Sequence, residues 1–386
     1  MSTIIRMSAA LLALVPLSTG VLAQQDSGTP AATPGTFTIG DLKPKDFTAP
    51  DFDVPQSPAF TALGVSADNA TSPVQATKLA LALLNGFDAN GNFQNGLAID
   101  THPYLLFNGR NITLEDYRSS AGVRLFTNTR LSLATTKGTE DDDKSLRVAA
   151  GLYLQPWIHA GDDPRRNEQY LTCLARAVQP PPGPPPSPDN QEAVELYRSQ
   201  ELKRLQGAAG PCTKTHLPSL ADPSAWSLSV APSFISKDGT NDALRWNGLS
   251  LATTLNLRIG QGPFSSGNNA NYGQVQVHAG YRLDEQVPDP AMTDGFDRQE
   301  STTLAFGYNL TRQGWKASVE AAQVWADRDG AASDSYTQYS AGASFRLADE
   351  IWLALTAGAR TGQDTDDDSF ANLSIKWNPG REKASR

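Results

Sequence analysis

The chain has 386 residues and a formal net charge of −9, with 39% hydrophobic and 19% charged residues. Both fractions lie below the averages of globular proteins, and 31 Gly and 26 Pro make up part of the difference. This composition argues against a helical enzyme with a thick apolar core. It also argues against nucleic acid as a partner, because nucleic-acid binding needs a basic surface.

Residues 1–23 have the features of a secretory signal peptide. Arg6 precedes an apolar stretch, Met7–Leu17, and the small or apolar residues Val21–Ala23 end the segment. The stretch is too short to span a membrane as a helix, and Pro16 interrupts it, which disfavours the alternative of an N-terminal anchor. We therefore expect export into an oxidising compartment, where cysteines pair.

The next segment, residues 24–95, is predicted to be a flexible leader that contains a short helix. Its first part, residues 24–55, is rich in Pro, Thr and Asp, which is typical of a loosely held chain. Apolar residues at helical spacing then predict a helix over Ser72–Asn85. This helix could plug a pore or lie outside it as an amphipathic helix, and the sequence leaves both open.

Residues 119 to 377 show a hydrophobic pattern that repeats every two residues, as in strands with two different faces. In Tyr336–Leu347, for example, apolar residues such as Tyr339 and Phe345 alternate with Gln, Ser, Gly and Arg. The predicted strands are Gly96–Phe107, Ala121–Ala134, Leu146–Trp157, Ser224–Ile235, Asn247–Ile259, Gly273–Leu283, Ser301–Leu310, Trp315–Trp325, Tyr336–Leu347, Ile351–Ala359 and Ala371–Trp377. The first contains Pro103, which restricts it to a sheet edge or an irregular strand.

The connections between these strands alternate between short turns and longer, acidic loops. The short ones are Thr311–Gln313 and Ala348–Glu350, and the acidic ones are Glu140–Asp143, Asp284–Asp297, Asp327–Asp334 and Asp364–Asp368. Strands of about ten residues with this alternation are typical of membrane barrels. We therefore predict an all-β fold, a transmembrane antiparallel up-and-down β-barrel of about 10–12 strands over residues 96–377. A soluble β-sandwich or lipocalin-like barrel is the alternative.

An insertion over residues 158–223 interrupts the strands. Its helix-like stretches, Asn167–Ala177 and Gln191–Leu205, flank a run of prolines, and Cys173 and Cys212 lie on either side of that run. A disulfide between these cysteines is expected, and it would close a loop worth roughly 3–4 kcal/mol of stability. Two free thiols, or a zinc site completed by distant histidines, are the alternatives.

Counting the strands from the C-terminus places this insertion at the end of the short turns, which is the periplasmic end of a membrane barrel. Large insertions in such barrels are more often external. The sequence therefore predicts either a periplasmic helical hairpin or a strand count that is wrong by one.

The C-terminal hairpin, Ile351–Ala359 and Ala371–Trp377, resembles that of Gram-negative outer-membrane β-barrel proteins of the porin-like class. Its last strand ends on an aromatic residue, similar to the barrel-assembly signal of that class, although a C-terminal tail, residues 378–386, follows here. The resemblance covers most of Gly96–Trp377 and is architectural. It implies a bacterial outer-membrane location, with outer-membrane lipid, lipopolysaccharide and the barrel-assembly machinery as partners.

If the apolar faces of the strands contact lipid, the opposite faces line a lumen. The predicted lumen-lining residues are Arg124, Arg130, Arg147, Arg258, Arg282, Lys316, Glu320, Arg346, Arg360 and Lys376. Arginines held close together in a narrow space repel one another, so protein carboxylates, a solute or counter-ions must neutralise them. Asp100 and Glu320 are the acids that share this parity.

Rings of Arg and Lys select anions, so the leading hypothesis is a passive channel for small, anionic solutes. The alternative is a non-conducting barrel, filled by polar side chains and the leader, that serves as a membrane anchor or interaction platform. We expect no enzyme activity, catalytic residue, cofactor or metal site. Asp100 and His102 could place an acid near a base, but this spacing alone does not define a general base.

Overall fold

The computed structural model describes residues 58–63, 97–107, 112–137, 145–177, 187, 190–217, 223–260, 264–265, 272–288, 296–312, 314–329, 333–348, 351–362 and 368–377. The predicted signal peptide, the predicted helix Ser72–Asn85 and the C-terminal tail lie outside these residues, as does all of the leader except residues 58–63.

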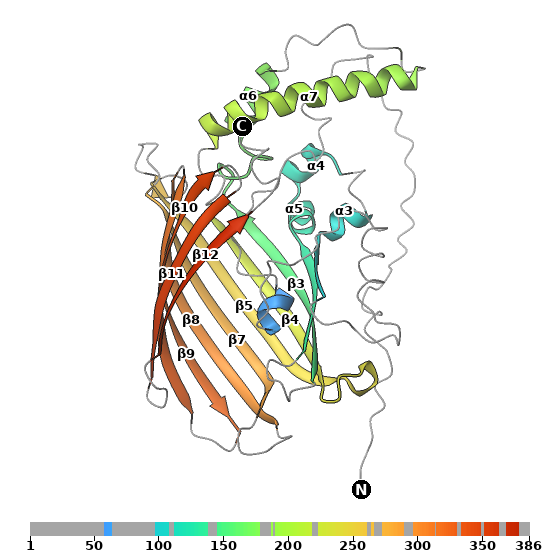
Figure 1. Ribbon diagram of the computed structural model, residues 1–386. Coiled ribbons are helices and arrows are strands. Elements are labelled where there is room, and N and C mark those ends of the chain that lie inside the picture. Colours follow the sequence, from blue (N-terminus) through green and yellow to red (C-terminus); the bar gives the residue numbers. More distant parts are fainter. Residues whose placement is uncertain are drawn as a thin grey trace.

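One antiparallel up-and-down sheet dominates the fold (Figure 1). Its path runs through β1 (Ala98–Thr101), β2 (Arg130–Lys137), β3 (Leu146–Ile158), β4 (Ala225–Ser236), β5 (Arg245–Gly260), β7 (Gln274–Pro288), β8 (Phe296–Arg312), β9 (Trp315–Arg328), β10 (Asp334–Ala348), β11 (Ile351–Gly362) and β12 (Asp368–Trp377). The two-residue β6 (Phe264–Ser265) pairs with β5 in parallel. Within the described residues β1 and β12 are the two ends of this path and do not pair with each other.

The sheet curls strongly and has two chemically different faces, as the period of two predicts. One register row of side chains on the first face, here called the polar face, consists of Arg258, Gln274, Asn309, Ser318, Gly342, Thr356 and Asn372. The opposite, apolar face carries exposed large side chains, including Trp226, Leu251, Val277, Phe306, Val319, Tyr339, Leu355 and Leu373. The described residues therefore have much of their apolar surface outside the curled sheet rather than in one thick core.

The helices are short, apart from α7, and lie at several places around the sheet. They are α1 (Pro58–Leu63), α3 (Pro103–Phe107), α4 (Leu114–Ser119), α5 (Ala121–Thr127), α6 (Glu168–Ala177), α7 (Gln191–His216) and the 3₁₀ turn η4 (Asn241–Ala243). Figure 1 shows α1 on the concave side of the sheet, whereas α6 and α7 lie beyond one end of the strands. No helix among the described residues is both long and apolar enough to cross a membrane.

Two predicted strands are wrong in part. The tract Ala121–Ala134 begins as helix α5, because the hydroxyl of Ser120 accepts a hydrogen bond from the backbone N–H of Val123 and caps that helix. Within Gly96–Phe107 only β1 is a strand, at the edge of the sheet as Pro103 indicates, and Pro103 itself begins helix α3.

The antiparallel order puts the insertion at the same end of the sheet as the short turns. β3, β8 and β10 run in one direction, so the segment that follows β3 leaves from the end where the β8–β9 and β10–β11 turns lie. This confirms the predicted position of the insertion relative to the strands. The second predicted helix is longer than expected, because α7 continues through Pro211 to His216.

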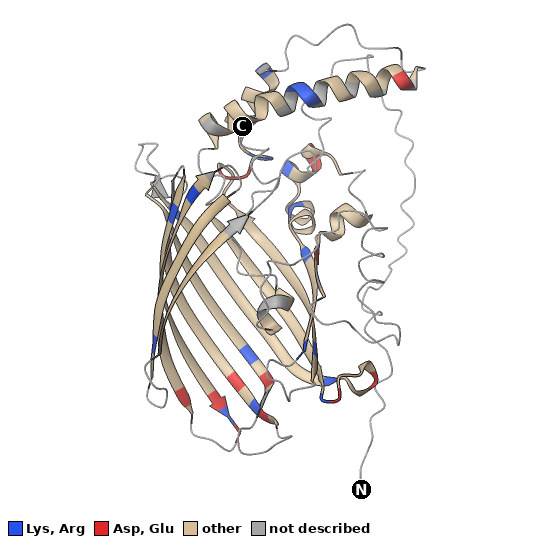
Figure 2. Cartoon of the chain, viewed as in Figure 1, with Lys and Arg blue, Asp and Glu red and all other residues tan. Residues whose placement is uncertain are grey.

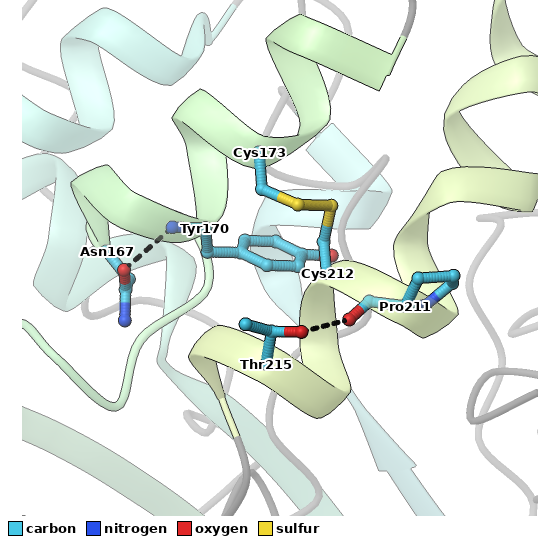
Figure 3. The surroundings of a disulfide bond; sticks show 6 residues. All are labelled: Asn167, Tyr170, Cys173, Pro211, Cys212 and Thr215. Carbon is cyan, nitrogen blue, oxygen red and sulfur yellow. Dashed lines mark hydrogen bonds between the residues drawn. A yellow bond between two sulfur atoms is a disulfide. The ribbon is translucent and has the colours of Figure 1, made fainter.

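The insertion contains a small helical unit, here called the cap, that is closed by the disulfide Cys173–Cys212 (Figure 3). The predicted pairing of these cysteines is confirmed. The buried core of the cap consists of Tyr170, Leu171, Leu174, Cys212 and Leu217 from the insertion, together with Leu114 of α4. Helix α6 begins where Asn167 accepts a hydrogen bond from the backbone N–H of Tyr170 (2.9 Å). The disulfide holds α6 against the C-terminal end of α7, where Pro211 would otherwise weaken the helix.

Candidate functional site

The candidate functional site is the polar face of the curled sheet. The predicted lumen residues on strands occupy positions of this one face: Arg130 on β2, Arg147 on β3, Arg258 on β5, Arg282 on β7, Lys316 and Glu320 on β9, Arg346 on β10, Arg360 on β11 and Lys376 on β12. Alternation along each strand, combined with the cross-strand register, brings these distant residues to one surface.

Arg124 is not part of this surface. It lies in helix α5, and its guanidinium donates hydrogen bonds to the carbonyl oxygens of Tyr117 (3.3 Å) and Arg118 (2.8 Å). These carbonyls belong to the last turn of α4, whose orphaned acceptors Arg124 satisfies. The predicted lumen role of Arg124 is therefore replaced by a structural one.

Protein carboxylates neutralise part of the basic surface. Asp100 on β1 lies 3.6 Å from Arg130, and Glu285 lies 2.9 Å from Arg282. A third ion pair joins Arg258 to Asp162. Of these three acids only Asp100 was expected on this face. The mutual repulsion that the sequence suggested is therefore reduced by the protein itself.

Aromatic rings on the same face also stack with guanidinium groups. Arg130 lies over the ring of Tyr153 at 4.7 Å, and Arg360 over the ring of Tyr336 at 3.5 Å. Such cation–π contacts favour the charged guanidinium in a partly desolvated site. In register, Arg360 is also paired with the position of Asp368.

Helix α1 sits directly on the polar face. The backbone N–H of Ala59 donates to the hydroxyl of Ser132 (3.1 Å), and the Arg282 guanidinium donates to the carbonyl oxygen of Ala62 (2.8 Å). Arg282 therefore joins Glu285 and the C-terminal end of α1 at one point. A cationic donor at a helix C-terminus is favourable because the last carbonyls lack partners in the helix.

Small residues on the sheet make room for this helix. Ala134, Ala149 and Ala231 are buried under α1 and form one core cluster with Ala59 and Ala62. Gly151 is part of the same surface, and a Cβ there would lie 2.7 Å from the backbone nitrogen of Ala59. The space beneath α1 thus depends on a residue without a side chain.

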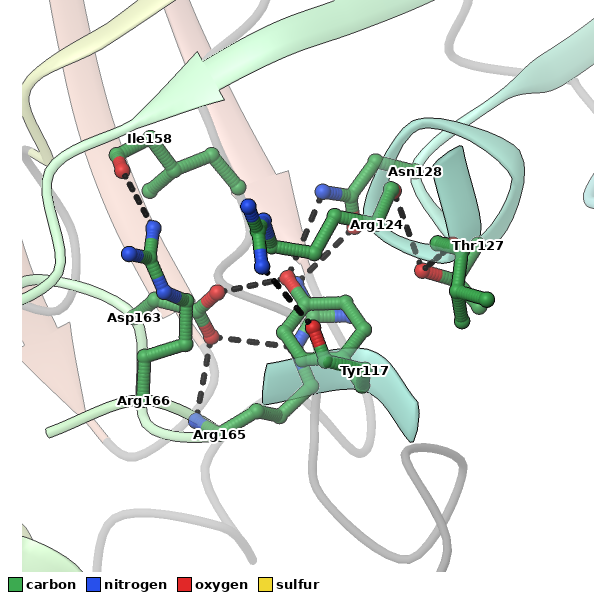
Figure 4. Close-up of polar contacts among 9 residues, drawn as sticks. Tyr117, Arg124, Thr127, Asn128, Ile158, Asp163, Arg165 and Arg166 are labelled. Atoms are coloured by element: carbon green, nitrogen blue, oxygen red, sulfur yellow. Dashed lines mark hydrogen bonds and ion pairs between the residues drawn. The ribbon is translucent and has the colours of Figure 1, made fainter. Parts of the chain in front are cut away.

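A second polar cluster ties the cap end of the sheet together (Figure 4). Asp163 accepts hydrogen bonds from the phenol of Tyr117 (2.5 Å) and from both the backbone nitrogen and Nε of Arg165 (3.0 Å each). The guanidinium of Arg165 also donates to Asn128 (2.9 Å) and stacks on the ring of Tyr117 (4.1 Å). Burial raises the pKa of Tyr117 well above its usual value, so the phenol keeps the proton that it donates.

The neighbouring Asp162 connects the start of the insertion to strand β5 and to the residue before β4. Its carboxylate accepts a hydrogen bond from the backbone N–H of Ser224 (2.8 Å) and pairs with Arg258. The Ser224 hydroxyl in turn accepts from the backbone N–H of Arg258 (3.0 Å). Because all three residues are buried, this network fixes how the insertion leaves β3 and returns to β4.

The histidines are built into the structure in different ways. Burial, followed by the charges of Arg130 and Arg165, lowers the pKa of His102 to about 4, so this imidazole is neutral at pH 7. His278 lies on the polar face, where its Nδ1 shares a hydrogen bond of 2.9 Å with the hydroxyl of Thr254. The described residues contain no group of three or more His, Cys, Asp or Glu arranged to hold a metal.

Charged side chains are unevenly distributed along the strands (Figure 2). Asp284, Glu300 and Asp327 lie at the ends of β7, β8 and β9 that are distant from α6 and α7, where Figure 2 shows several acidic positions. Lys316 and Arg346 lie at the opposite end, beside the short turns. The basic residues Arg298 and Arg328 lie at the same ends as the acids. Most residues of the acidic loops lie outside the described residues, so the gathering of acid in the loops stays a prediction.

Asp162, Asp163, Arg165 and Glu285 were not identified from the sequence. Asp162, Asp163 and Arg165 flank Pro164 in the insertion, outside the alternating strands, and their partners Ser224, Arg258, Tyr117 and Asn128 lie far away along the chain. Glu285 reaches Arg282 because a register shift in the β7–β8 pairing follows Arg282, and an alternation rule does not predict such a bulge.

No protein-family model, curated protein or solved structure matches this chain.

Proposed function

We propose that the chain forms an outer-membrane β-barrel and acts as a passive channel for small, anionic solutes, with the polar face as its lumen. The observation that carries this proposal is the separation of the two faces. Large apolar side chains such as Phe306 and Leu373 are more than half exposed on one side, whereas the register row from Arg258 to Asn372 on the other side is polar or small. A surface of this kind suits a lipid-facing exterior around a water-filled interior.

The charge of the polar face supports a preference for anions. This face carries the basic residues Arg130, Arg147, Arg258, Arg282, Lys316, Arg346 and Arg360. The acids at strand positions of the face are Asp100, Glu285 and Glu320 and, near the strand ends, Asp297, Asp334 and Asp368. Apart from Asp100 and Glu320, these acids lie toward the ends distant from α6 and α7, so the rest of the face carries more positive than negative charge, which favours anions in a narrow passage.

The proposal includes a location and partners. We place residues 1–23 as a signal peptide, the insertion in the periplasm, and the acidic loop ends outside the cell, where they face lipopolysaccharide. Insertion would require the barrel-assembly machinery, which is expected to read the last strand before Trp377. Closure of the sheet into a barrel belongs to the same proposal.

A second function is favoured by the position of α1. Because α1 is packed against β2, β3 and β4 and bonded to Ser132 and Arg282, part of the polar face is already occupied. A barrel filled in this way would not conduct, and it would serve as a membrane anchor that presents the cap to a partner.

Planar-bilayer recordings separate the two functions. The purified full chain and a variant lacking residues 24–95 are inserted into bilayers and compared. A channel restricted by α1 predicts small conductance steps for the full chain and larger steps for the deletion variant. If neither protein shows conductance although heat-modifiable gel mobility verifies that both are folded for insertion, the channel is contradicted and the membrane-anchor function remains.

A further inference from the structure

The apolar face contains a groove at its cap end that the proposed channel does not use. The groove has a volume of about 450 Å³ and is lined by Trp157, Trp226, Thr253, Leu255, Val277 and Ala279. This volume is within the range of small-ligand sites. Thr253 and Ala279, which are paired in register, have small side chains that leave the hollow, and the larger side chains of Trp157, Trp226, Leu255 and Val277 surround it.

The two tryptophans show that the groove lies near the cap ends of β3 and β4. Trp157 and Trp226 are paired in register near the end of β3 and the start of β4, and they are 37% and 40% exposed. The indole N–H of Trp226 donates to the hydroxyl of Thr253 (2.8 Å), so this ring presents apolar carbon to the hollow. Tryptophans at strand ends are typical of the boundary between lipid chains and headgroups.

A positive charge lies at the same end. The guanidinium of Arg166 donates a hydrogen bond to the carbonyl oxygen of Ile158 (3.3 Å), the residue after Trp157. The ring of His159 contacts that of Trp157 edge-on, with centroids 6.5 Å apart. Among the described residues no carboxylate forms an ion pair with Arg166, because Asp162 is held by Arg258 and Glu168 lies near Arg118.

We infer that this groove binds one glycerophospholipid, with an acyl chain between Trp157 and Trp226 and its phosphate on Arg166. The inference rests on the proposed insertion into a membrane and adds a defined lipid site to it. The chemistry supports this occupant, since the hollow is apolar and the Arg166 guanidinium lies at the carbonyl of Ile158, the residue next to the lining residue Trp157. Arginine suits phosphate because its planar fork offers several N–H donors.

The test uses the full chain purified in mild detergent and measures bound phospholipid by native mass spectrometry. Wild type is expected to retain one phospholipid. Arg166→Gln keeps the size of the side chain but removes the charge, and about tenfold weaker retention is expected from the loss of one charge-assisted contact. Ala279→Trp fills the hollow and is expected to abolish retention.

Matched controls are available on the same surfaces. Arg176→Gln removes an exposed arginine of α6, and Ala321→Trp adds the same bulk to the apolar face of β9. Both are expected to retain lipid like wild type. Equal retention by all five proteins, or an adduct with only the mass of the detergent, would overturn the site.

Failure of the site is distinguishable from failure of the channel. Flotation with liposomes of phosphatidylethanolamine and phosphatidylglycerol reports insertion independently of lipid retention. Wild type that floats but retains no phospholipid contradicts the groove alone. Wild type that does not float contradicts the proposed membrane protein and the groove with it.

Discussion

Tyr117 donates a hydrogen bond of 2.5 Å to Asp163, and both side chains are completely buried although 46 positions separate them. The bond connects helix α4, which precedes β2, to the turn that follows β3. Arg165 donates a hydrogen bond to Asn128, and Asn128 donates one to Tyr117, so the polar groups of this buried cluster are hydrogen-bonded to one another. Within the described residues, this cluster connects the cap end of the sheet without a metal site or a second disulfide bond.

Removing the phenol oxygen should therefore destabilise the fold. Tyr117→Phe leaves Asp163 with one donor fewer in a dry site, and we expect the free energy of unfolding to fall by about 1–3 kcal/mol. Urea unfolding of the refolded protein measures the change. Tyr272→Phe, at a half-exposed tyrosine, serves as control and should change stability by less than about 0.5 kcal/mol. Equal effects would show that the cluster contributes nothing specific.

The disulfide should stabilise the cap more than the sheet. Cys173 and Cys212 close a loop with a sequence separation of 39, for which the chain-entropy model gives roughly 3–4 kcal/mol. In the double variant Cys173→Ser, Cys212→Ser we expect proteolysis within α6 and α7 to become much faster while the strands stay protected. Cleavage sites mapped by mass spectrometry report both. Unchanged cap cleavage would contradict this assignment.

His102 should make stability depend on pH. Its pKa is about 4 in the folded chain and about 6.5 when unfolded, so between these values only the unfolded chain binds the proton. Stability should therefore fall as pH decreases from about 7 to about 4, by about 3 kcal/mol from this residue. Urea midpoints at several pH values measure the slope. His102→Gln should have a flatter profile, and an identical slope in both proteins would refute the role of His102.

The packing of α1 against the polar face should depend on Gly151. A Cβ at this position meets the Ala59 backbone, so Gly151→Ala is expected to displace the helix from the polar face. With Ala62→Cys as the free thiol, maleimide labelling should be faster in the Gly151→Ala background. Gly307→Ala is the matched control, because the nearest atoms to its added Cβ are 3.6 Å away. Equal labelling rates in all backgrounds would contradict docking through Gly151.

The sequence was most informative for the strands, because alternating apolar residues determine which face of the sheet each side chain occupies. Phe345 and Leu355 share the apolar face because strict alternation allows each strand one orientation, and the antiparallel register follows from short turns. Alternation fails as a predictor after Ser120, because the hydroxyl of this residue caps helix α5 at the start of an alternating tract. The motif Thr113-x-x-Asp116, a complete capping box in the structure, is the sequence signal that would have placed a helix before it.

The site was harder to predict because its neutralising groups come from elsewhere in the chain. Asp162 contacts Arg258 and Ser224 only after the insertion has folded back onto β4 and β5. Glu285 contacts Arg282 only because the ladder is irregular there. Alternation assigns a face to each strand residue, but it contains no information about such convergence.

The reversal potential of single channels under a KCl gradient tests the central claim most directly. The full chain and the variant lacking residues 24–95 are recorded in the same bilayers, with the orientation of the gradient reversed as an internal control. A lumen formed by the polar face, with Arg147 and Arg360 among its fixed charges, predicts a potential of the sign given by chloride preference. Potassium preference, or no conductance from either inserted protein, would contradict the account.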